Sequence, residues 1–436
     1  MLAANAESVP VTETSHRSSF FRQSGWLMIA NIAGGMMMWA VHFLSKAIGP
    51  KEYGIFGVLL AIVMLVPNMP LQMVLAHQTA QALATRRERQ LAGMIRLALL
   101  GTFVLWLVGT LIVGLLHQSI LTRWGITNPV GFWLTILAVL GALWQPIFWG
   151  VLQGAQNFLW WGWSMIINGV GRVTLAASMV WLLVTMDRPN SYAAGILVGV
   201  LAGYVVSTSL AAWHARRLWA VEAVAFDRGA FLREAIPPML VFAAFQFLLT
   251  ADTMFVKSYF SNDQAGFYLS AGTLSRALMW FVGPLAAVMF PRLVHSAAKA
   301  EKSNLMGLVL MGTGVLAIVG AASLSVLGPF IVKIVSGEKF VAVASSILPW
   351  YAFAMVPLCL ANVLLNNLLA QSSLKAAVPL FVLAVAYGFA LTRFHDSLQM
   401  VLKTMGLCNV ALLLICAWFT WAVKRPQPAN ASTQGA

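Results

Sequence analysis

Charged side chains inside long apolar stretches are the residues of this chain whose types could do chemistry. Asp252, Arg276 and Arg172 each lie within such a stretch. A charged group at the centre of a bilayer costs about 2.5–3.5 kcal/mol on insertion scales, so each one needs a partner or a function. A guanidinium group can also bind phosphate oxygens through two parallel N–H bonds, which suits an anionic ligand.

Arg172 belongs to a stripe of polar residues. Ser164, Asn168 and Arg172 are spaced i, i+4 and i+8, which places them on one face of a helix. Such a face lines water or another helix and not lipid. The predicted spans offer Arg172 no acidic partner of its own, so we expect it to contact substrate. Asn168 is a candidate for the same lining, with an interhelical hydrogen bond as the alternative.

Asp252 and Arg276 are predicted to pair across the hairpin of two successive spans. Their depths should differ by about 6 Å at a rise of 1.5 Å per residue, within reach of an arginine side chain. Such a pair can be structural or can contact substrate. Both residues are therefore candidates for the lining of a substrate cavity.

Lys257, His42 and four amide residues extend the set of candidates. Lys257 lies on a stripe with Gln246, Thr250 and Thr253, close to an outer helix end where a lysine is expected to snorkel to the interface. His42 could line the cavity, although a lone histidine is more often structural. Interhelical hydrogen bonds are the alternative role for the amides, which are Asn168, Gln246, Asn362 and Asn366.

Twelve apolar stretches must position these side chains. A bilayer core about 30 Å thick needs roughly 20 apolar residues per helix. The predicted spans are 25–46, 54–74, 95–116, 131–152, 160–184, 192–213, 236–258, 266–290, 305–330, 343–368, 375–393 and 399–423. The sequence therefore predicts an all-α integral membrane protein with about 12 transmembrane helices.

Composition and charge support a membrane protein and fix its expected orientation. Apolar residues make up 60% of the 436 residues, Asp, Glu, Lys and Arg make up 9%, and the mean hydropathy is +0.82. The net charge of +14 lies mostly in short loops on one side, with 16 basic residues against 8, so it does not indicate nucleic-acid binding. By the positive-inside rule, that side and both termini are cytoplasmic.

The two halves of the chain look like a parallel repeat at an offset of about 212 residues. The turn after the first span and the turn after the seventh align, and Pro70 aligns with Pro284. Transporters can be built from two such halves. The predicted parts are a disordered tail at 1–24, a six-helix lobe at 25–217, a cytoplasmic linker at 218–235, a second six-helix lobe at 236–424 and a disordered tail at 425–436.

Several segments resemble polysaccharide-export flippases of the multidrug/oligosaccharidyl-lipid/polysaccharide (MOP) superfamily. They are GPKEYGIFG at 49–57, GVLQGAQNF at 150–158, DTMFVKSYFSNDQAGFY at 252–268, AGTLSRAL at 271–278 and MFPRL at 289–293. The resemblance implies two lobes around a cavity that opens alternately to each side. It also implies an oligosaccharide substrate on a polyprenyl diphosphate, and makes a polysaccharide polymerase and glycosyltransferases the expected protein partners.

The leading hypothesis is thus a flippase in a bacterial inner membrane that serves cell-surface polysaccharide synthesis, such as O-antigen, lipopolysaccharide or exopolysaccharide. A cation-coupled multidrug antiporter of the same superfamily would need more buried carboxylates than Asp252 alone. A peptidoglycan-precursor flippase typically has more spans. A polytopic enzyme acting on lipid-linked glycans would show a large outer loop or a carboxylate cluster. The sequence contains no GxxxxGK[ST] or HExxH motif, so we expect no enzyme, cofactor or metal.

Overall fold

The computed structural model describes residues 13–298, 305–370 and 376–422, which are almost entirely helical and contain no strand. The elements are α1 (Glu13–Ala40), η1 (Val41–Leu44), α2 (Ser45–Met64), α3 (Asn68–Ala84), α4 (Glu88–Leu115), α5 (His117–Arg123), α6 (Val130–Gly154), α7 (Phe158–Thr185), η2 (Pro189–Ser191), α8 (Tyr192–Trp219), α9 (Arg228–Tyr259), α10 (Asn262–Ala298), α11 (Leu305–Val326), α12 (Gly328–Val335), α13 (Glu338–Ala370), α14 (Ala377–Arg393) and α15 (Leu398–Trp421).

Each predicted span corresponds to a helix or to a run of joined helices. The described residues hold nine helical stretches that are long and apolar enough to cross a membrane. The first of these, Gly25–Ala84, contains two passes, because Gly49 has φ 75° and ψ 174° and turns the chain before Pro50. The second pass is broken again ahead of α3 at Pro67, whose ring removes a helical N–H. The chain is therefore a multi-pass membrane protein.

Helices α1 and α9 begin inside two of the predicted non-helical segments. Helix α1 begins at Glu13, so residues 13–24 of the predicted tail are helical. Helix α9 begins at Arg228, so the predicted linker contains only eight residues that lie outside helices, 220–227. The Asp227 side chain accepts a hydrogen bond from the Ala230 amide at 2.9 Å and caps the new helix, which explains the early start. Residues 1–12 and 425–436 of the predicted tails lie outside the described residues.

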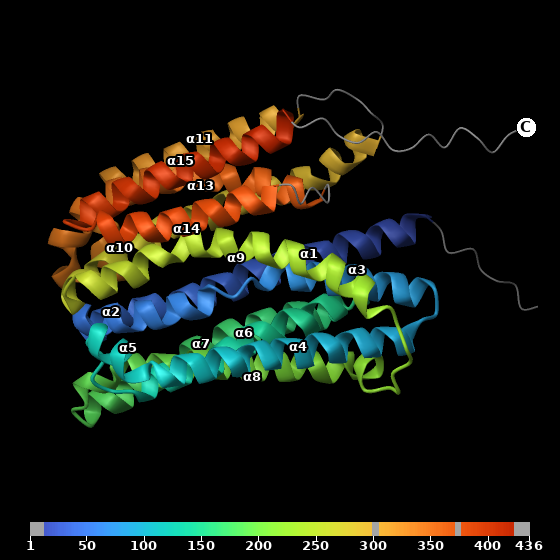
Figure 1. The fold of residues 1–436 in the computed structure, drawn as a ribbon, viewed down its shortest axis with the longest axis horizontal. Helices are drawn as coiled ribbons and strands as arrows, with labels where there is room; N and C mark the ends of the chain where they lie inside the picture. The colour runs from blue at the N-terminus through green and yellow to red at the C-terminus, as the bar shows by residue number, and fades with distance from the viewer. Residues whose placement is uncertain (1–12, 299–304, 371–375, 423–436) are drawn as a thin grey trace, which may run out of the picture.

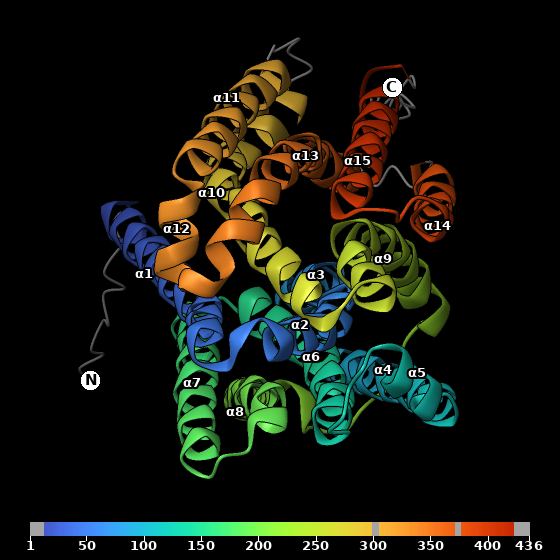
Figure 2. The same ribbon diagram turned by 90° about the vertical axis from the view of Figure 1, so that its left-hand side faces the viewer.

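The helices form two lobes, α1–α8 and α9–α15, which Figure 2 shows in end view. In the first lobe α6 packs against α3, α4 and α8, and in the second α13 packs against α10, α11 and α15. Likewise α7 contacts α1 and α8, while α14 contacts α9 and α15. The same pairing order in both lobes is the arrangement that a parallel repeat predicts.

The molecule has two ends. Helix α1 begins and α15 ends at what we call the proximal end, and the opposite end is the distal end, which lies on the left in Figure 1. Charge in the loops predicts that the proximal end is cytoplasmic. One apolar core containing residues of both lobes, among them Tyr53 and Tyr268, extends towards the distal end, whereas a separate core around Leu75 and Val151 serves the first lobe and the start of α9.

Helices α2 and α10 join the lobes at the distal end. A Cβ atom on Gly54 would lie 2.5 Å from the carbonyl oxygen of Asn262 and 2.8 Å from the amide nitrogen of Gly266. A Cβ on Gly266 would in turn collide with the backbone of Pro50, and one on Gly57 would collide with Leu269. Only glycine permits so close a backbone approach. We call this contact of Pro50, Gly54 and Gly57 with Asn262, Gly266 and Leu269 the distal gate.

Candidate functional site

Asp252 is the centre of a buried polar cluster in the second lobe. Its side chain in α9 is completely enclosed. Tyr268 of α10 donates a hydrogen bond to Oδ2 at 2.9 Å, and Tyr351 of α13 donates a second one to the same oxygen. The Arg276 guanidinium supplies the compensating charge, with Nη2 at 2.8 Å from Oδ1 and 2.9 Å from Oδ2. The predicted pairing of Asp252 with Arg276 is therefore confirmed.

Arg276 itself is held by three helix-9 groups. Its Nη2 also donates to the Thr253 hydroxyl at 2.9 Å, and its Nε donates to the carbonyl oxygen of Leu249 at 3.1 Å. The side chain is 14% exposed, in contrast to Asp252 at 0%. The guanidinium also lies 5.4 Å from the centre of the Tyr351 ring. These bonds hold the Arg276 guanidinium in one orientation. Asp252 compensates its charge, and the side chain remains partly exposed.

His42 lies on a hydrogen-bonded path between the two lobes. Its Nδ1 is 2.8 Å from the Tyr53 hydroxyl, which lies 3.4 Å from the hydroxyl of Thr273 in the second lobe. The ring is buried and lies within electrostatic range of both Arg172 and Arg276. Of the predicted candidates, His42 is therefore the one that both arginines influence and that continues through Tyr53 towards the second lobe.

Arg172 has no counter-charge. It is 7% exposed, and its guanidinium carbon lies 5.4 Å from the centre of the Tyr204 ring of α8. Within the described ranges its guanidinium makes no hydrogen bond or ion pair, and Nε is enclosed without a partner. Ser164 and Asn168 of the same stripe are buried too, and Oδ1 of Asn168, an acceptor, is enclosed without a partner among the described residues. The stripe therefore faces protein, as predicted. It contains one hydrogen-bond donor, Nε of Arg172, and one acceptor, Oδ1 of Asn168, that have no partner among the described residues.

Lys257 departs from its predicted position. We expected this lysine to snorkel to the interface, but its side chain is 2% exposed and donates to Oδ1 of Asn262 across the α9–α10 turn. Asn262 in turn donates from Nδ2 to the carbonyl oxygen of Gly125 in the first lobe, at 3.3 Å. Lys257 is therefore buried and bonded to Asn262 of the distal gate. The exposed Lys46 and Lys403 lie beside the Phe43 and Trp350 rings, as interface lysines do.

Gln246 makes an interhelical bond of the kind that was the alternative to substrate contact, whereas Asn362 and Asn366 bond to each other within α13. Gln246 donates to the carbonyl oxygen of Met64 at 3.0 Å, which links α9 to α2. Asn366 donates to the backbone and side-chain oxygens of Asn362 at 2.8 and 3.2 Å. These residues have protein partners, and Arg172 stands apart from them in this respect.

Sequence reasoning missed two groups of buried polar residues. Glu52 was placed in a turn, yet its side chain is 4% exposed. Tyrosines 53, 268, 351 and 387 are all buried, and two of them bind Asp252. With only 7 tyrosines in the chain, those inside apolar stretches could have been recognised as donors for the single acid there.

A family model for "Polysaccharide biosynthesis protein" matches residues 20–297, which is more than half of the chain and includes both Arg172 and the Asp252–Arg276 pair. The chain belongs to this polysaccharide biosynthesis family. Among curated proteins, none matches it by sequence.

Solved structures of MOP-superfamily transporters share the fold of this polysaccharide biosynthesis family member. An inward-facing multidrug resistance MATE transporter of that superfamily has a TM-score of 0.66 at 12% identity over 89% of this chain and 94% of that one. The eukaryotic MATE transporter AtDTX14 has a TM-score of 0.62 at 15% identity, covering 91% and 96%. The lipid II flippase MurJ in an inward closed conformation has a TM-score of 0.60 at 13% identity, covering 92% and 88%. At these identities the likeness shows a common fold.

Proposed function

We propose that this protein moves a polyprenyl-diphosphate-linked oligosaccharide from the inner to the outer leaflet of a bacterial inner membrane by alternating access. It thereby supplies lipid-linked units for cell-surface polysaccharide synthesis, where a polymerase and glycosyltransferases act on the same carrier lipid. The family to which the chain belongs and the MOP fold both support this proposal. The observation that carries it is the unpaired charge of Arg172.

The charge balance favours an anionic substrate. Arg276 is matched by Asp252, whereas Arg172 has no acidic partner among the described residues. A buried cation without a partner is costly, and a diphosphate would provide both the counter-charge and acceptors for its N–H groups. An excess positive charge is the reverse of what a carrier of cationic drugs needs. The same argument disfavours the antiporter hypothesis.

The membrane potential favours this direction of transport. An anion leaving an inside-negative cell gains about 2.3 kcal/mol per charge for every 100 mV that it crosses. Asp252 offers little to a coupling ion, because both of its oxygens accept hydrogen bonds and Arg276 balances its charge. Export of a diphosphate-linked glycan therefore requires no coupling ion at Asp252.

The proposal is tested by reconstituting the protein in liposomes with a fluorescent polyprenyl-diphosphate oligosaccharide on one leaflet. An impermeant glycosidase or lectin then measures how much of the headgroup reaches the other leaflet. We expect transport by the wild-type protein, a large loss for Arg172→Lys, which cannot form the two parallel N–H bonds, and no transport for Arg172→Ala.

Abundance separates a substrate contact from a structural role. Arg172→Ala should insert at near wild-type level, because the residue has no ion pair to lose. Arg217→Ala provides the matched control, since Arg217 is an exposed arginine at the proximal end of α8, and should transport normally. Full transport by a stable Arg172→Ala protein would show that Arg172 does not bind the substrate. Absence of transport by the wild-type protein would refute the proposed function itself.

A further inference from the structure

The carboxylate of Glu52 is buried at the distal end of the first lobe, and only one of its two oxygens has a hydrogen-bond partner among the described residues. Its Oε2 accepts a hydrogen bond from the amide of Ala193 at 2.9 Å, in the first turn of α8. Its Oε1 is enclosed and has no hydrogen-bond partner among the described residues. Buried carboxylate oxygens are nearly always satisfied, so an unpartnered one indicates a bound small species or a proton.

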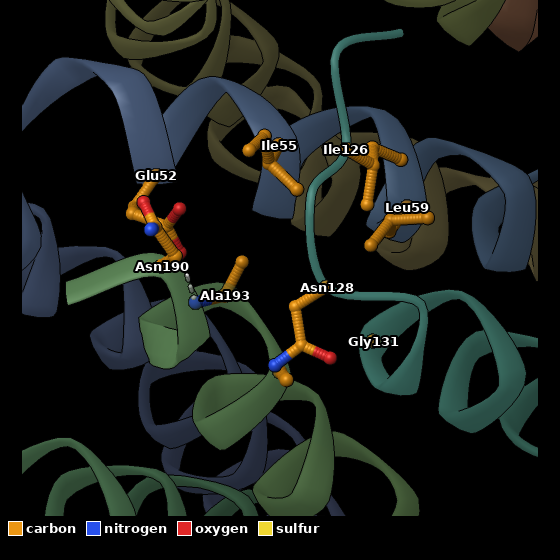
Figure 3. A pocket seen from close by; sticks show the side chains of 9 residues that line it. Glu52, Ile55, Leu59, Ile126, Asn128, Gly131, Asn190 and Ala193 are labelled. Atoms are coloured by element: carbon orange, nitrogen blue, oxygen red, sulfur yellow. Dashed lines mark hydrogen bonds between the residues drawn. The ribbon is translucent and has the colours of Figure 1, made fainter. Parts of the chain in front are cut away.

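Glu52 also lines a small cavity. It has a volume of about 10 Å³, room for one water molecule. Its walls come from α2, the loop before α6, and the start of α8, and Figure 3 shows the Glu52 carboxylate next to Asn190, with its bond to Ala193 dashed. Asn190 is exposed at the distal end, so water from that end can reach the cavity. The lining residues are Glu52, Ile55, Leu59, Ile126, Asn128, Gly131, Asn190, Ala193 and Ala194.

The charges around Glu52 suit a proton better than a metal cation. Lys51 on the same helix and Lys257 of α9 act on it electrostatically, and Asp263 of α10 acts on Lys257. From α8 it meets backbone amides, whose partial positive charge favours an ionised carboxylate. Burial acts in the opposite direction and favours the neutral acid. Two nearby lysines would repel a metal ion, and the described residues contain no cluster of three metal-ligating side chains.

The position of Glu52 links it to the distal gate. Residues 52 and 54 project from nearly opposite faces of α2 at 100° per residue. Glu52 therefore ties α2 to α8 of its own lobe, while Gly54 packs against α10 of the other lobe. Lys257 lies on the other side of the gate, where it donates to the side chain of Asn262. Gly54 packs against the carbonyl oxygen of the same asparagine. Opposite charges thus sit on the two sides of the closed gate.

We propose that Glu52 and its cavity form a proton-binding site that opens to the distal end and controls the distal gate. Ionised Glu52 attracts Lys257 and holds the lobes together. When a proton from distal water binds Oε1, the cavity gives the new O–H group room for a water molecule as its acceptor, and Oε2 keeps its bond to Ala193. The attraction to Lys257 is then lost, and the gate opens more readily. The gating half of this proposal depends on the alternating access proposed above, whereas proton binding does not.

Proton binding is tested by infrared difference spectroscopy on the whole protein in nanodiscs, between neutral and acidic pH. We expect a protonated-carboxyl band in wild type and in the control Glu338→Gln, which removes an exposed distal glutamate. Glu52→Gln should lack that band. If Glu52→Gln keeps the full band, Glu52 does not bind the proton. If sodium at neutral pH shifts the Glu52 carboxylate band instead, the site holds a metal cation and the proposal is wrong.

Gating is tested with spin labels at Thr127 and Gln264, which are exposed on the two sides of the gate. In a cysteine-free background, acid should lengthen the label distance in wild type and in Glu338→Gln. Glu52→Gln should show the longer distance at both pH values, and Lys257→Gln should abolish the pH response. A pH response that persists unchanged in Glu52→Gln would refute the gating role. Because neither measurement involves substrate, these results stand or fall independently of glycan transport.

Discussion

Replacing Arg276 should destabilise the protein more than replacing Asp252, although each change breaks the same ion pair. Arg276→Gln leaves the Asp252 carboxylate with two tyrosine donors but no counter-charge, in a site with 0% exposure. Asp252→Asn leaves a guanidinium that is 14% exposed and still bonded to Leu249 and Thr253. The enclosed anion cannot reach water, whereas the cation can turn towards it.

The expected magnitudes follow from burial. Removing one partner of a buried ion pair costs about 3–5 kcal/mol, because an unpaired charge remains. Arg276→Gln should lie at the upper end of that range and Asp252→Asn at or below its lower end. The double variant Asp252→Asn/Arg276→Gln leaves two neutral groups that can bond to each other. It should recover at least about 2 kcal/mol relative to the sum of the single changes, as contacting residues do in double-mutant cycles.

The assay is the free energy of unfolding of the purified protein in mixed micelles, with membrane abundance measured on the same variants. The Lys333–Glu338 pair is a matched control, since it is also in contact, at 2.6 Å, but its side chains are 62% and 73% exposed. Its double-mutant cycle should give a coupling of about 0–1 kcal/mol. Strictly additive losses at Asp252 and Arg276, or a larger loss for Asp252→Asn, would refute the reasoning. Transport should recover less than stability in the double variant if Arg276 also contacts the substrate.

Two further predictions concern the gate and the topology. Gly54→Ala should weaken the closed distal gate, because its Cβ would lie 2.5 Å from the Asn262 carbonyl oxygen, and so should increase labelling of Ala265→Cys by an impermeant maleimide. Gly101→Ala, whose Cβ meets nothing within 4 Å, should have no effect, and equal labelling in both would exclude a steric gate at Gly54. Reporter fusions after Arg89, Arg217 and Lys302 should report the cytoplasm, and fusions after Arg123 and Arg188 the outside. A periplasmic signal at Arg217 would contradict both the span count and the orientation.

Hydrophobicity was enough to predict the elements, because a bilayer imposes one length on every span. Within the described residues all twelve predicted spans fall on helices, and the turn expected after the first span lies at Gly49–Pro50. Helices α1 and α9 begin before residues 24 and 235, because polar residues outside the bilayer can still be helical. In both cases the helix extends beyond its apolar part, and apolar length gives no signal for that extension.

The partners of buried charges in the candidate site could be predicted from the sequence, because an unpaired buried charge is costly. The burial of residues next to turns could not, because it depends on packing against distant parts of the chain. The pairing of Asp252 with Arg276 followed from the cost of a lone buried charge and from hairpin geometry. The burial of Lys257 and Glu52 did not, because each lies beside a turn in sequence and is enclosed by elements far along the chain. Glu52 meets α8, more than a hundred residues away, and no local pattern encodes that contact.

The distribution of bond strengths suits lobes that move as units. Towards the distal end the charge-assisted bonds lie within lobes: Arg276 to Asp252 at 2.8 Å in the second, and Ala193 to Glu52 at 2.9 Å in the first. Near the start of α9, by contrast, Glu234 accepts a hydrogen bond from Gln78 and contacts His77, both of the first lobe. The bonds between the lobes towards the distal end are neutral. Trp124 donates to Ser258 at 2.9 Å, and the others are long: Tyr53 to Thr273 at 3.4 Å, Ser45 to Val335 at 3.5 Å and Asn262 to Gly125 at 3.3 Å. Neutral bonds of this length are individually weak. Separating the lobes at the distal end therefore breaks neutral bonds and glycine packing, while charge-assisted bonds hold each lobe together and keep α3 on α9.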